Sequence, residues 1–330
     1  MSNEYKIGVV GGGAWGTAIA SLLSQKEKVL MWVKEKSVSS DINKNSRNKK
    51  YLPKIKLNKK IKATNNMQDL KGLKFLFVVV PTQYISEVFK GYKNLLDPEC
   101  IVVCCSKGIE IKSLNLASEI IEDIYPNNKI AVMSGPNFAN EIAKGLPAAA
   151  LIASRSNSCA KTVATIMKSK TFRPYLSNDV VGAQIAGALK NIYAIACGIV
   201  VGKNYGDNAV ASIITRSFSE ICIVGQVLNA KKDTLSGLSG IGDLFLTCSS
   251  TKSRNFSLGI KLAKGVSLNS IVQKNSSIAE GVFTVRALKK ISSKYQLSLP
   301  IGDTIYQILY RNKNIDNAIQ ELLNRPLRKE

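Results

Sequence analysis

KIGVVGGGAWGTA, residues 6–18, is the stretch that decides the fold, because it runs from an apolar strand through a glycine turn into the start of a helix. Its G-x-G-x-x-G spacing falls on Gly11, Gly13 and Gly16. The first glycine permits the turn, the second lets the backbone approach a pyrophosphate closely, and the third lets the helix pack on the strand. Glycine turns of this spacing also occur as plain packing elements, but the strand before it and the apolar helix over 18–23 favour a dinucleotide-binding turn.

Apolar runs bounded by turn signals recur through the first half of the chain, at residues 28–33, 74–80, 101–105 and 130–133, with further strand-like pieces at 149–153 and 171–176. Helix-like segments between several of these runs predict an α/β fold with a doubly wound parallel sheet of the Rossmann type. Ligands of such sheets lie beyond the carboxyl ends of the strands. We therefore expect Lys107, Gly135 and Asn137, which follow two of the runs, to lie at the same sheet edge as the glycine turn.

The second half of the chain has a helical pattern. Asp179 is placed to cap a helix over 180–201, and amphipathic stretches continue the all-α character at 284–295 and 303–310. We expect two domains: a dinucleotide-binding Rossmann domain over 1–178 and an all-α substrate and catalytic domain over 179–330.

Composition and patterning argue for a soluble protein. The first apolar run begins within six residues of Met1 and leads straight into the glycine turn, so it resembles neither a signal peptide nor a transit peptide, and a cytoplasmic location is expected. The apolar stretch 180–201 carries Gln184, Lys190 and Asn191, which a membrane span would rarely contain. The seven cysteines include no C-x-x-C pair, which favours reduced core thiols over metal ligands or disulfides.

The formal net charge of +23 fits either a nucleic-acid-binding surface or a lysine-rich surface without such a partner. The lysines are scattered and become dense only over 43–62, with no RNA-binding signature beside them, so we expect that segment to be solvated and no nucleic acid to bind. The chain has no histidine. An acid or base working near neutral pH must then be Lys, Asp, Glu, Tyr or Cys.

Lys190 is the strongest candidate for such a group, because it lies in the middle of a helix that is apolar nearly all round. Its ammonium either reaches the surface by snorkelling or is partly desolvated and able to transfer a proton. Lys107 lies on a loop where an anionic substrate or a cofactor would bind, although a lysine on such a loop is, taken alone, more often a solvated residue. In the helical half, the glycine-rich segment 237–247 delivers Asp243 as either a helix cap or a site carboxylate. Arg254 offers a planar guanidinium suited to bidentate contacts with phosphate.

Seven motifs stand in order along about residues 7–284: Gly11-x-Gly13-Ala14-Trp15-Gly16-Thr17, Ser106-Lys107-Gly108, Ser134-Gly135-Pro136-x-Phe138-Ala139, Lys190-Asn191, Gly240-x-Gly242-Asp243-Leu244-x-x-Thr247-Cys248, Ser253-Arg254-Asn255 and Glu280-Gly281. Together they resemble the NAD(P)-dependent sn-glycerol-3-phosphate dehydrogenases of bacteria.

The resemblance implies a role for each matching residue. Lys190 matches the proton acceptor. The substrate-lining positions match at Lys107, Gly135, Asn137, Lys190, Asn191, Asp243, Ser253, Arg254 and Asn255. Cofactor contacts match at Ala14, Trp15, Lys34, Lys107, Ala139, Arg254, Ile278 and Glu280, in addition to the three glycines of the turn.

Three positions depart from the family pattern. Asn137 stands where Thr or Ser is more frequent but keeps a side chain that forms hydrogen bonds. Asn140 stands where a lysine is common, and Ala14, where a serine is frequent, offers mainly its backbone N–H.

The choice between NAD and NADP stays open at the end of the second strand. An acidic residue there favours the free ribose hydroxyls of NAD. Lys34 could instead meet the 2′-phosphate of NADP, while Glu35 has the opposite preference one position later, so use of both cofactors is expected.

The resemblance implies reversible hydride transfer between sn-glycerol 3-phosphate and dihydroxyacetone phosphate, supplying glycerol 3-phosphate for phospholipid synthesis, by a homodimer. The alternative is a related Rossmann-plus-helical dehydrogenase acting on 3-hydroxy acids. Those relatives usually separate the helix lysine and asparagine, whereas Lys190 and Asn191 are adjacent, and Arg254 suits a phosphorylated substrate better. A non-catalytic nucleotide sensor is disfavoured because Lys107, Lys190, Asp243 and Arg254 are all present.

Overall fold

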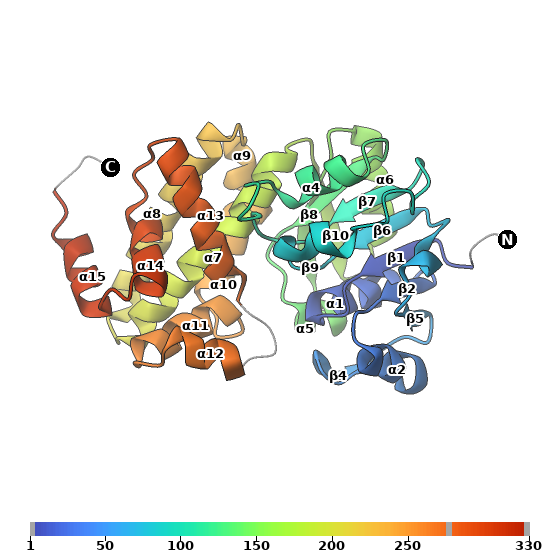
Figure 1. The fold of residues 1–330 in the computed structure, drawn as a ribbon, viewed down its shortest axis with the longest axis horizontal. Coiled ribbons are helices and arrows are strands. Elements are labelled where there is room, and N and C mark those ends of the chain that lie inside the picture. The colour runs from blue at the N-terminus through green and yellow to red at the C-terminus, as the bar shows by residue number, and fades with distance from the viewer. Residues whose placement is uncertain (1–3, 275–278, 327–330) are drawn as a thin grey trace. The chain divides into compact units, whose positions relative to one another are not determined.

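The computed structural model describes residues 4–274 and 279–326, with the backbone alone over 272–274. The chain forms two compact units (Figure 1). The first, the sheet unit, contains the residues up to 107 together with 115–184. The second, the helical unit, contains residues 108–114 and those from 185 onward. An α/β Rossmann-type part followed by an all-α part confirms the predicted fold class.

The sheet unit contains an eight-stranded sheet in the order β10-β9-β8-β7-β6-β1-β2-β5 (Figure 1). Its strands are β1 (Ile7–Val10), β2 (Val29–Trp32), β5 (Ile61–Thr64), β6 (Phe75–Val78), β7 (Ile101–Cys104), β8 (Ile130–Ser134), β9 (Ala148–Ala153) and β10 (Phe172–Ser177). All neighbouring strands pair in parallel except β8 and β9, which are antiparallel. The five apolar runs that predicted a parallel sheet are β1, β2, β6, β7 and β8. The sequence did not reveal β5, or the small ribbon of β3 (Arg47–Asn48) and β4 (Leu52–Lys56).

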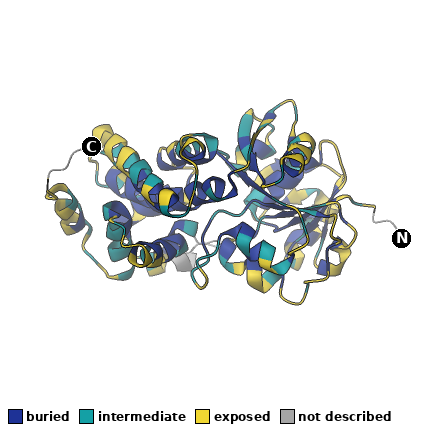
Figure 2. Cartoon of the chain, turned by 90° about the horizontal axis from the view of Figure 1, so that it is seen from above, coloured by how far each residue is buried: buried dark blue, intermediate teal, exposed yellow. Residues whose placement is uncertain are grey.

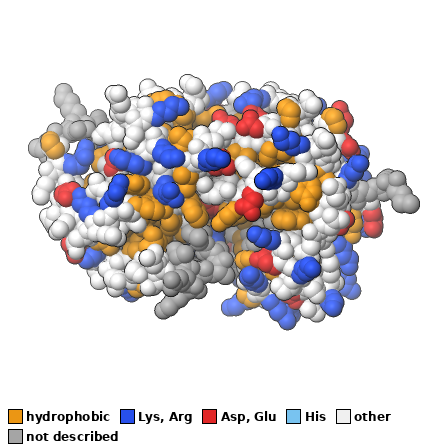
Figure 3. Space-filling model, in the orientation of Figure 1, with side chains coloured by type: hydrophobic (Ala, Val, Ile, Leu, Met, Phe, Trp, Pro, Cys, Tyr) orange, Lys and Arg blue, Asp and Glu red, His pale blue; other side chains and the backbone are white. Residues whose placement is uncertain are grey.

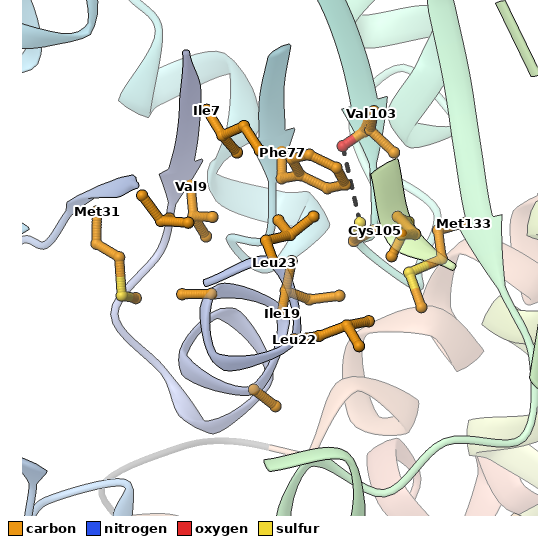
Figure 4. Packing of buried hydrophobic residues seen from close by; sticks show 14 of the residues in the cluster. Ile7, Val9, Ile19, Leu22, Leu23, Met31, Phe77, Val103, Cys105 and Met133 are labelled. Atoms are coloured by element: carbon orange, nitrogen blue, oxygen red, sulfur yellow. Dashed lines mark hydrogen bonds between the residues drawn. The ribbon is translucent and has the colours of Figure 1, made fainter. Parts of the chain in front are cut away.

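Helices cover both faces of this sheet, and the strands supply apolar side chains to both. The helical elements of this unit are α1 (Ala14–Leu23), α2 (Lys36–Asn45), η1 (Met67–Leu70), η2 (Thr82–Tyr84), α3 (Ile85–Val88), α4 (Ala117–Ile124), α5 (Ala139–Ala143) and α6 (Asn157–Met167). Val9 and Phe77 pack with Ile19 and Leu23 of α1 on one face (Figure 4). Val10, the next residue, belongs to the cluster on the opposite face. Burial on both faces explains why these strands are continuous apolar runs.

The helical unit is arranged around the part of α7 (Val180–Gly202) that begins at residue 185, and the side chains of this helix are almost all buried. Its other elements are α8 (Gly206–Val227), α9 (Lys232–Leu235), the π-helical turn η3 (Leu238–Gly242), α10 (Asp243–Cys248), α11 (Arg254–Ala263), α12 (Leu268–Lys274), α13 (Glu280–Lys294), α14 (Pro300–Tyr310) and α15 (Ile315–Leu323). Buried residues line the inner faces of the helices, and the outer faces are exposed (Figure 2). At the start of α7, the Gly182 N–H donates to Asp179 Oδ1 over 2.8 Å, which confirms the predicted cap.

Two helices of the described chain, α7 and α8, are long and apolar enough to cross a membrane by length and composition alone. Of the most apolar 18-residue window in each helix, 89% is buried inside the protein for α7 and 33% for α8. Core helices of soluble proteins pass the same test, so the finding is weak evidence for a span. The seven cysteines all lie among the described residues as free thiols, and six of them are buried, as expected for core residues.

A buried carboxylate joins three helices of the helical unit. Glu220 of α8 is 4% exposed and accepts hydrogen bonds from the backbone N–H groups of Ile301 and Gly302, over 2.7 and 3.0 Å, at the start of α14. The Tyr193 hydroxyl of α7 donates to the same carboxylate over 3.1 Å. Burial raises the pKa of Glu220 to about 7, although these three donors oppose the rise.

Candidate active site

The glycine turn has the geometry of an anion cradle. Gly11 has a φ of +129°, and a Cβ on Gly16 would lie 2.0 Å from the Gly11 carbonyl oxygen, so both positions require glycine. Gly13 is the N-cap of α1 and has no side chain to cap it. A Cβ added at Gly13 would meet no atom within 4 Å. The space over the N-terminus of α1 therefore fits the pyrophosphate of a dinucleotide, with backbone N–H groups of the first turn as donors.

Residues after β7 and β8 are brought together within the same unit. The Lys107 ammonium donates to the Gly135 carbonyl oxygen over 2.9 Å, and Gly135 has a φ of +152°. The Asn137 amide donates to the Ala149 carbonyl oxygen over 3.1 Å, while its own Oδ1 is buried without a partner among the described residues. An unsatisfied buried acceptor of this kind calls for a donor from a ligand or water.

Trp15 and Ala139 complete this part of the predicted site. The Trp15 indole N–H donates to the carbonyl oxygen of Cys105, two residues before Lys107, over 3.2 Å. Ala139 is the first residue of α5, which packs beside α1. The Ala14 backbone starts α1, next to the open space at Gly13. These positions are compatible with cofactor contacts, and their roles remain predictions.

The lysine-rich segment 43–62 differs from the expected solvated surface in one part. Lys and Arg side chains do gather over the region of α2 and β4 (Figure 3). Asn48, however, is fully buried, and its amide donates to the Gly12 carbonyl oxygen and the Thr17 hydroxyl, over 2.8 Å each. This link could not be predicted from the sequence, because an asparagine among lysines is typical of a loop.

In the helical unit, Lys190 is 7% exposed, so the snorkelling interpretation is wrong. Its ammonium donates to Asp243 Oδ1 over 2.5 Å and to the Thr247 hydroxyl oxygen over 2.8 Å. The Thr247 hydroxyl donates in turn to the Asp243 carbonyl oxygen over 2.6 Å. A carboxylate and a hydroxyl thus hold one ammonium in a fixed orientation. Thr247 belongs to the motif over 240–248, where the sequence assigns it no role. The structure places its hydroxyl against the Lys190 amine.

Asn191 and Asn255 form a second polar pair beside Lys190. The Asn255 amide donates to Asn191 Oδ1 over 2.9 Å and accepts at Oδ1 from the Gly281 N–H over 3.0 Å. The pair can form because α7 and α11 approach closely. A Cβ on Gly198 would lie 2.0 Å from the Phe256 carbonyl oxygen, so the two backbones touch at glycine.

The start of α11 carries two more predicted residues. Ser253 is the N-cap, and its hydroxyl accepts from the Phe256 N–H over 3.3 Å. Arg254, the first helical residue, is exposed. A guanidinium at a helix N-terminus adds its donors to the positive end of the helix dipole, an arrangement that suits a phosphate group.

Glu280 starts α13, and its Oε2 is buried without a partner among the described residues. Burial raises the pKa of Glu280 to about 7, while the charge of Arg254 opposes the rise. An unsatisfied buried carboxyl oxygen calls for a partner from a ligand or water. The predicted cofactor contact at Ile278 lies outside the described residues.

Comparisons with known proteins agree with both halves of this arrangement. Residues 6–160 match the NAD-dependent glycerol-3-phosphate dehydrogenase N-terminus, and residues 179–320 match the C-terminus of the same family. A glycerol-3-phosphate dehydrogenase [NAD(P)+] of Zymomonas mobilis is 40% identical over 326 residues, covering 99% of this chain and 95% of that protein. The one from Novosphingobium aromaticivorans is 42% identical over 333 residues, covering 99% and 98%.

Among solved structures, the glycerol-3-phosphate dehydrogenase of Coxiella burnetii is 32% identical, with a TM-score of 0.94 over 98% of this chain and 99% of that one. This similarity of sequence and fold extends over nearly the whole chain. The chain is an oxidoreductase that belongs to the NAD-dependent glycerol-3-phosphate dehydrogenase family.

Proposed function

We propose that this chain interconverts sn-glycerol 3-phosphate and dihydroxyacetone phosphate with NAD or NADP, and so supplies glycerol 3-phosphate for phospholipid synthesis. The observation that carries the proposal is the buried ammonium of Lys190, held between Asp243 and Thr247. A related dehydrogenase of 3-hydroxy acids is the weaker candidate, since both halves of the chain match the glycerol-3-phosphate family.

When bound, the nicotinamide supplies or accepts the hydride at C2 of the substrate. In the reductive direction, the Lys190 ammonium gives a proton to the oxygen that develops negative charge at C2. In the oxidative direction, neutral Lys190 takes the proton of the C2 hydroxyl. Asp243 and Thr247 keep the amine pointed at one position, so little reorganisation is needed during the reaction.

The phosphate group is assigned to Arg254 and the first turn of α11. Its binding would hold C2 near the amine and the nicotinamide. Asn191 and Asn255 are fixed to each other and to α13, so they would orient the substrate hydroxyls from a rigid frame. Lys107, Gly135 and Asn137 are assigned to the substrate from the sheet unit, and Lys107 also to the cofactor.

The test follows the absorbance of reduced nicotinamide at neutral pH with dihydroxyacetone phosphate, in separate runs with NADH and NADPH. The wild-type chain is expected to turn over, and Lys190→Met to lose about a hundredfold to ten-thousandfold in rate. Lys264→Met, an exposed lysine after α11, is the matched control and should keep the wild-type rate. Full turnover by Lys190→Met would remove the lysine from the mechanism. Activity with a 3-oxo acid and none with dihydroxyacetone phosphate would favour the weaker candidate.

We further propose that the functional division falls at residues 1–178 and 179–330, and that the protein works in the cytoplasm as a homodimer. The partly exposed apolar helix α8 supports self-association. Light scattering should then give twice the chain mass of 35.8 kDa, and a mass of one chain at micromolar concentration would exclude the dimer.

A further inference from the structure

The corner that follows β2 lies directly beside the glycine turn. The Gly11 N–H donates to the carbonyl oxygen of Trp32, the last residue of β2, over 3.0 Å. Glu35, three residues later, is the N-cap of α2. In dinucleotide-binding folds, the residue that meets the adenosine ribose stands near this strand end, where an acidic side chain accepts from the ribose hydroxyls.

The Glu35 carboxylate is fixed by two neighbours from the ribbon. The Tyr51 hydroxyl donates to Glu35 Oε1 over 2.7 Å, and the Lys50 ammonium donates to the same oxygen over 3.2 Å. The Lys50 ammonium also lies 5.2 Å from the centre of the Tyr51 ring. A carboxylate accepts about four hydrogen bonds through its two oxygens. Because both bonds end on Oε1, Oε2 keeps capacity for the hydroxyls of a ribose.

This arrangement is anchored to the cofactor turn. Asn48, buried against Gly12 and Thr17, also accepts at Oδ1 from the Tyr51 N–H over 3.3 Å. Tyr51 is thus connected to the glycine turn through one side chain. The Tyr51 hydroxyl that donates to Glu35 is therefore fixed relative to the glycine turn and does not belong to a solvated loop.

The charge at this corner is the negative charge of the Glu35 carboxylate, which Tyr51 and Lys50 hold in place. Partial burial opposes ionisation of Glu35, but the hydrogen bonds from Tyr51, Lys50 and its own backbone outweigh burial, so the pKa of Glu35 is lowered. An anion in contact with the ribose repels a 2′-phosphate and accepts from a 2′-hydroxyl. Lys34 is exposed and is not held against the carboxylate, whereas the charge of Lys50 is already paired with it.

We propose that Glu35 accepts the adenosine ribose hydroxyls and makes this chain prefer NADH to NADPH, with Tyr51 and Lys50 as positioning residues. The inference deepens the cofactor part of the proposed function. The sequence Lys34-Glu35 led us to expect use of both cofactors, and the proposal adds a preference between them.

Isothermal titration calorimetry of the full chain with NADH and with NADPH, without substrate, tests the proposal. The wild type should bind NADH more tightly by about tenfold, because the Glu35 carboxylate accepts from the ribose hydroxyls of NADH and repels the 2′-phosphate of NADPH. Glu35→Gln should move the ratio of the two dissociation constants toward NADPH by about tenfold. Tyr51→Phe removes the hydroxyl that donates to Glu35 and should weaken NADH binding severalfold. Glu27→Gln, the same change at an exposed position before β2, should change neither constant.

Equal or tighter binding of NADPH by the wild type would overturn the proposal, as would an unchanged ratio in Glu35→Gln. Binding of neither cofactor would overturn it too. Because calorimetry needs no turnover, a chain that binds NADH preferentially but does not reduce dihydroxyacetone phosphate would refute only the proposed function. Thermal unfolding by circular dichroism checks that both variants fold.

Discussion

The two units present their candidate site residues in different ways. In the sheet unit, backbone atoms dominate: the glycine turn and the carbonyl oxygens that accept from Trp15 and Lys107. In the helical unit, buried side chains pair with each other, as Lys190 does with Asp243. A site of backbone atoms is damaged by added atoms, and a site of paired side chains by removed ones. Substitutions of both kinds therefore test this difference.

Removal of Asp243 should cost the most stability. Asp243→Ala leaves the Lys190 charge buried without its carboxylate, which typically costs about 3–5 kcal/mol. Glu321 of α15 is the control, because its side chain is 66% exposed and paired with Lys313. Glu321→Ala should lose less than about 1 kcal/mol. Urea unfolding followed by circular dichroism measures both losses, and equal losses would contradict the prediction.

Glu220 should give the helical unit a dependence of stability on pH. Its pKa is about 7 in the folded chain and 4.5 for the unperturbed group, so the folded state holds a proton that the unfolded state releases. The free energy of unfolding therefore falls as pH rises between these values, by up to about 3 kcal/mol from this group. Glu220→Gln should remove that part of the slope.

The pH control comes from the sheet unit. The pKa of Glu35 is lowered, so its stabilisation is lost only as pH falls below about 4.5. The difference in stability between wild type and Glu35→Gln should stay constant between about pH 5 and pH 8. A constant difference for Glu220→Gln over the same range would mean that Glu220 does not titrate there.

Two alanine substitutions in the glycine turn separate folding from binding. Gly16→Ala places a Cβ against the Gly11 carbonyl oxygen and should cost about 1–3 kcal/mol of stability. Gly13→Ala meets no protein atom, so it should unfold like the wild type but bind NADH at least about tenfold more weakly. Urea unfolding measures the stability of both variants, and calorimetry measures their affinity for NADH. Normal binding by Gly13→Ala would place the pyrophosphate elsewhere.

Lys107→Met should cost less stability than the changes at Asp243 and Gly16. Its hydrogen bond to the Gly135 carbonyl oxygen comes from a half-buried side chain and is worth about 0.5–1.5 kcal/mol. The same variant should raise the KM for dihydroxyacetone phosphate. A loss of stability as large as that of Asp243→Ala would show that the sheet unit also depends on buried charge.

Much of the fold was predictable because burial on both faces makes β1, β6 and β7 continuous apolar runs. The antiparallel pairing of β9 was not, since local composition does not encode strand direction. Lys190 stood out as a charge in an apolar helix, but its contact with Thr247 is set by how α10 packs on α7. The role of Asn48 was hidden for the same reason: its partners lie more than 30 residues away in the chain.

Both tryptophans of the chain, Trp15 and Trp32, lie in the sheet unit, one on α1 and one at the end of β2. Selective excitation of indole therefore reports on the surroundings of the glycine turn, whereas far-ultraviolet circular dichroism is weighted toward the helical unit. The two optical signals will coincide during denaturation if the units melt together and diverge if they melt separately. The chain thus carries an intrinsic probe for the independence of its two halves, without any added label.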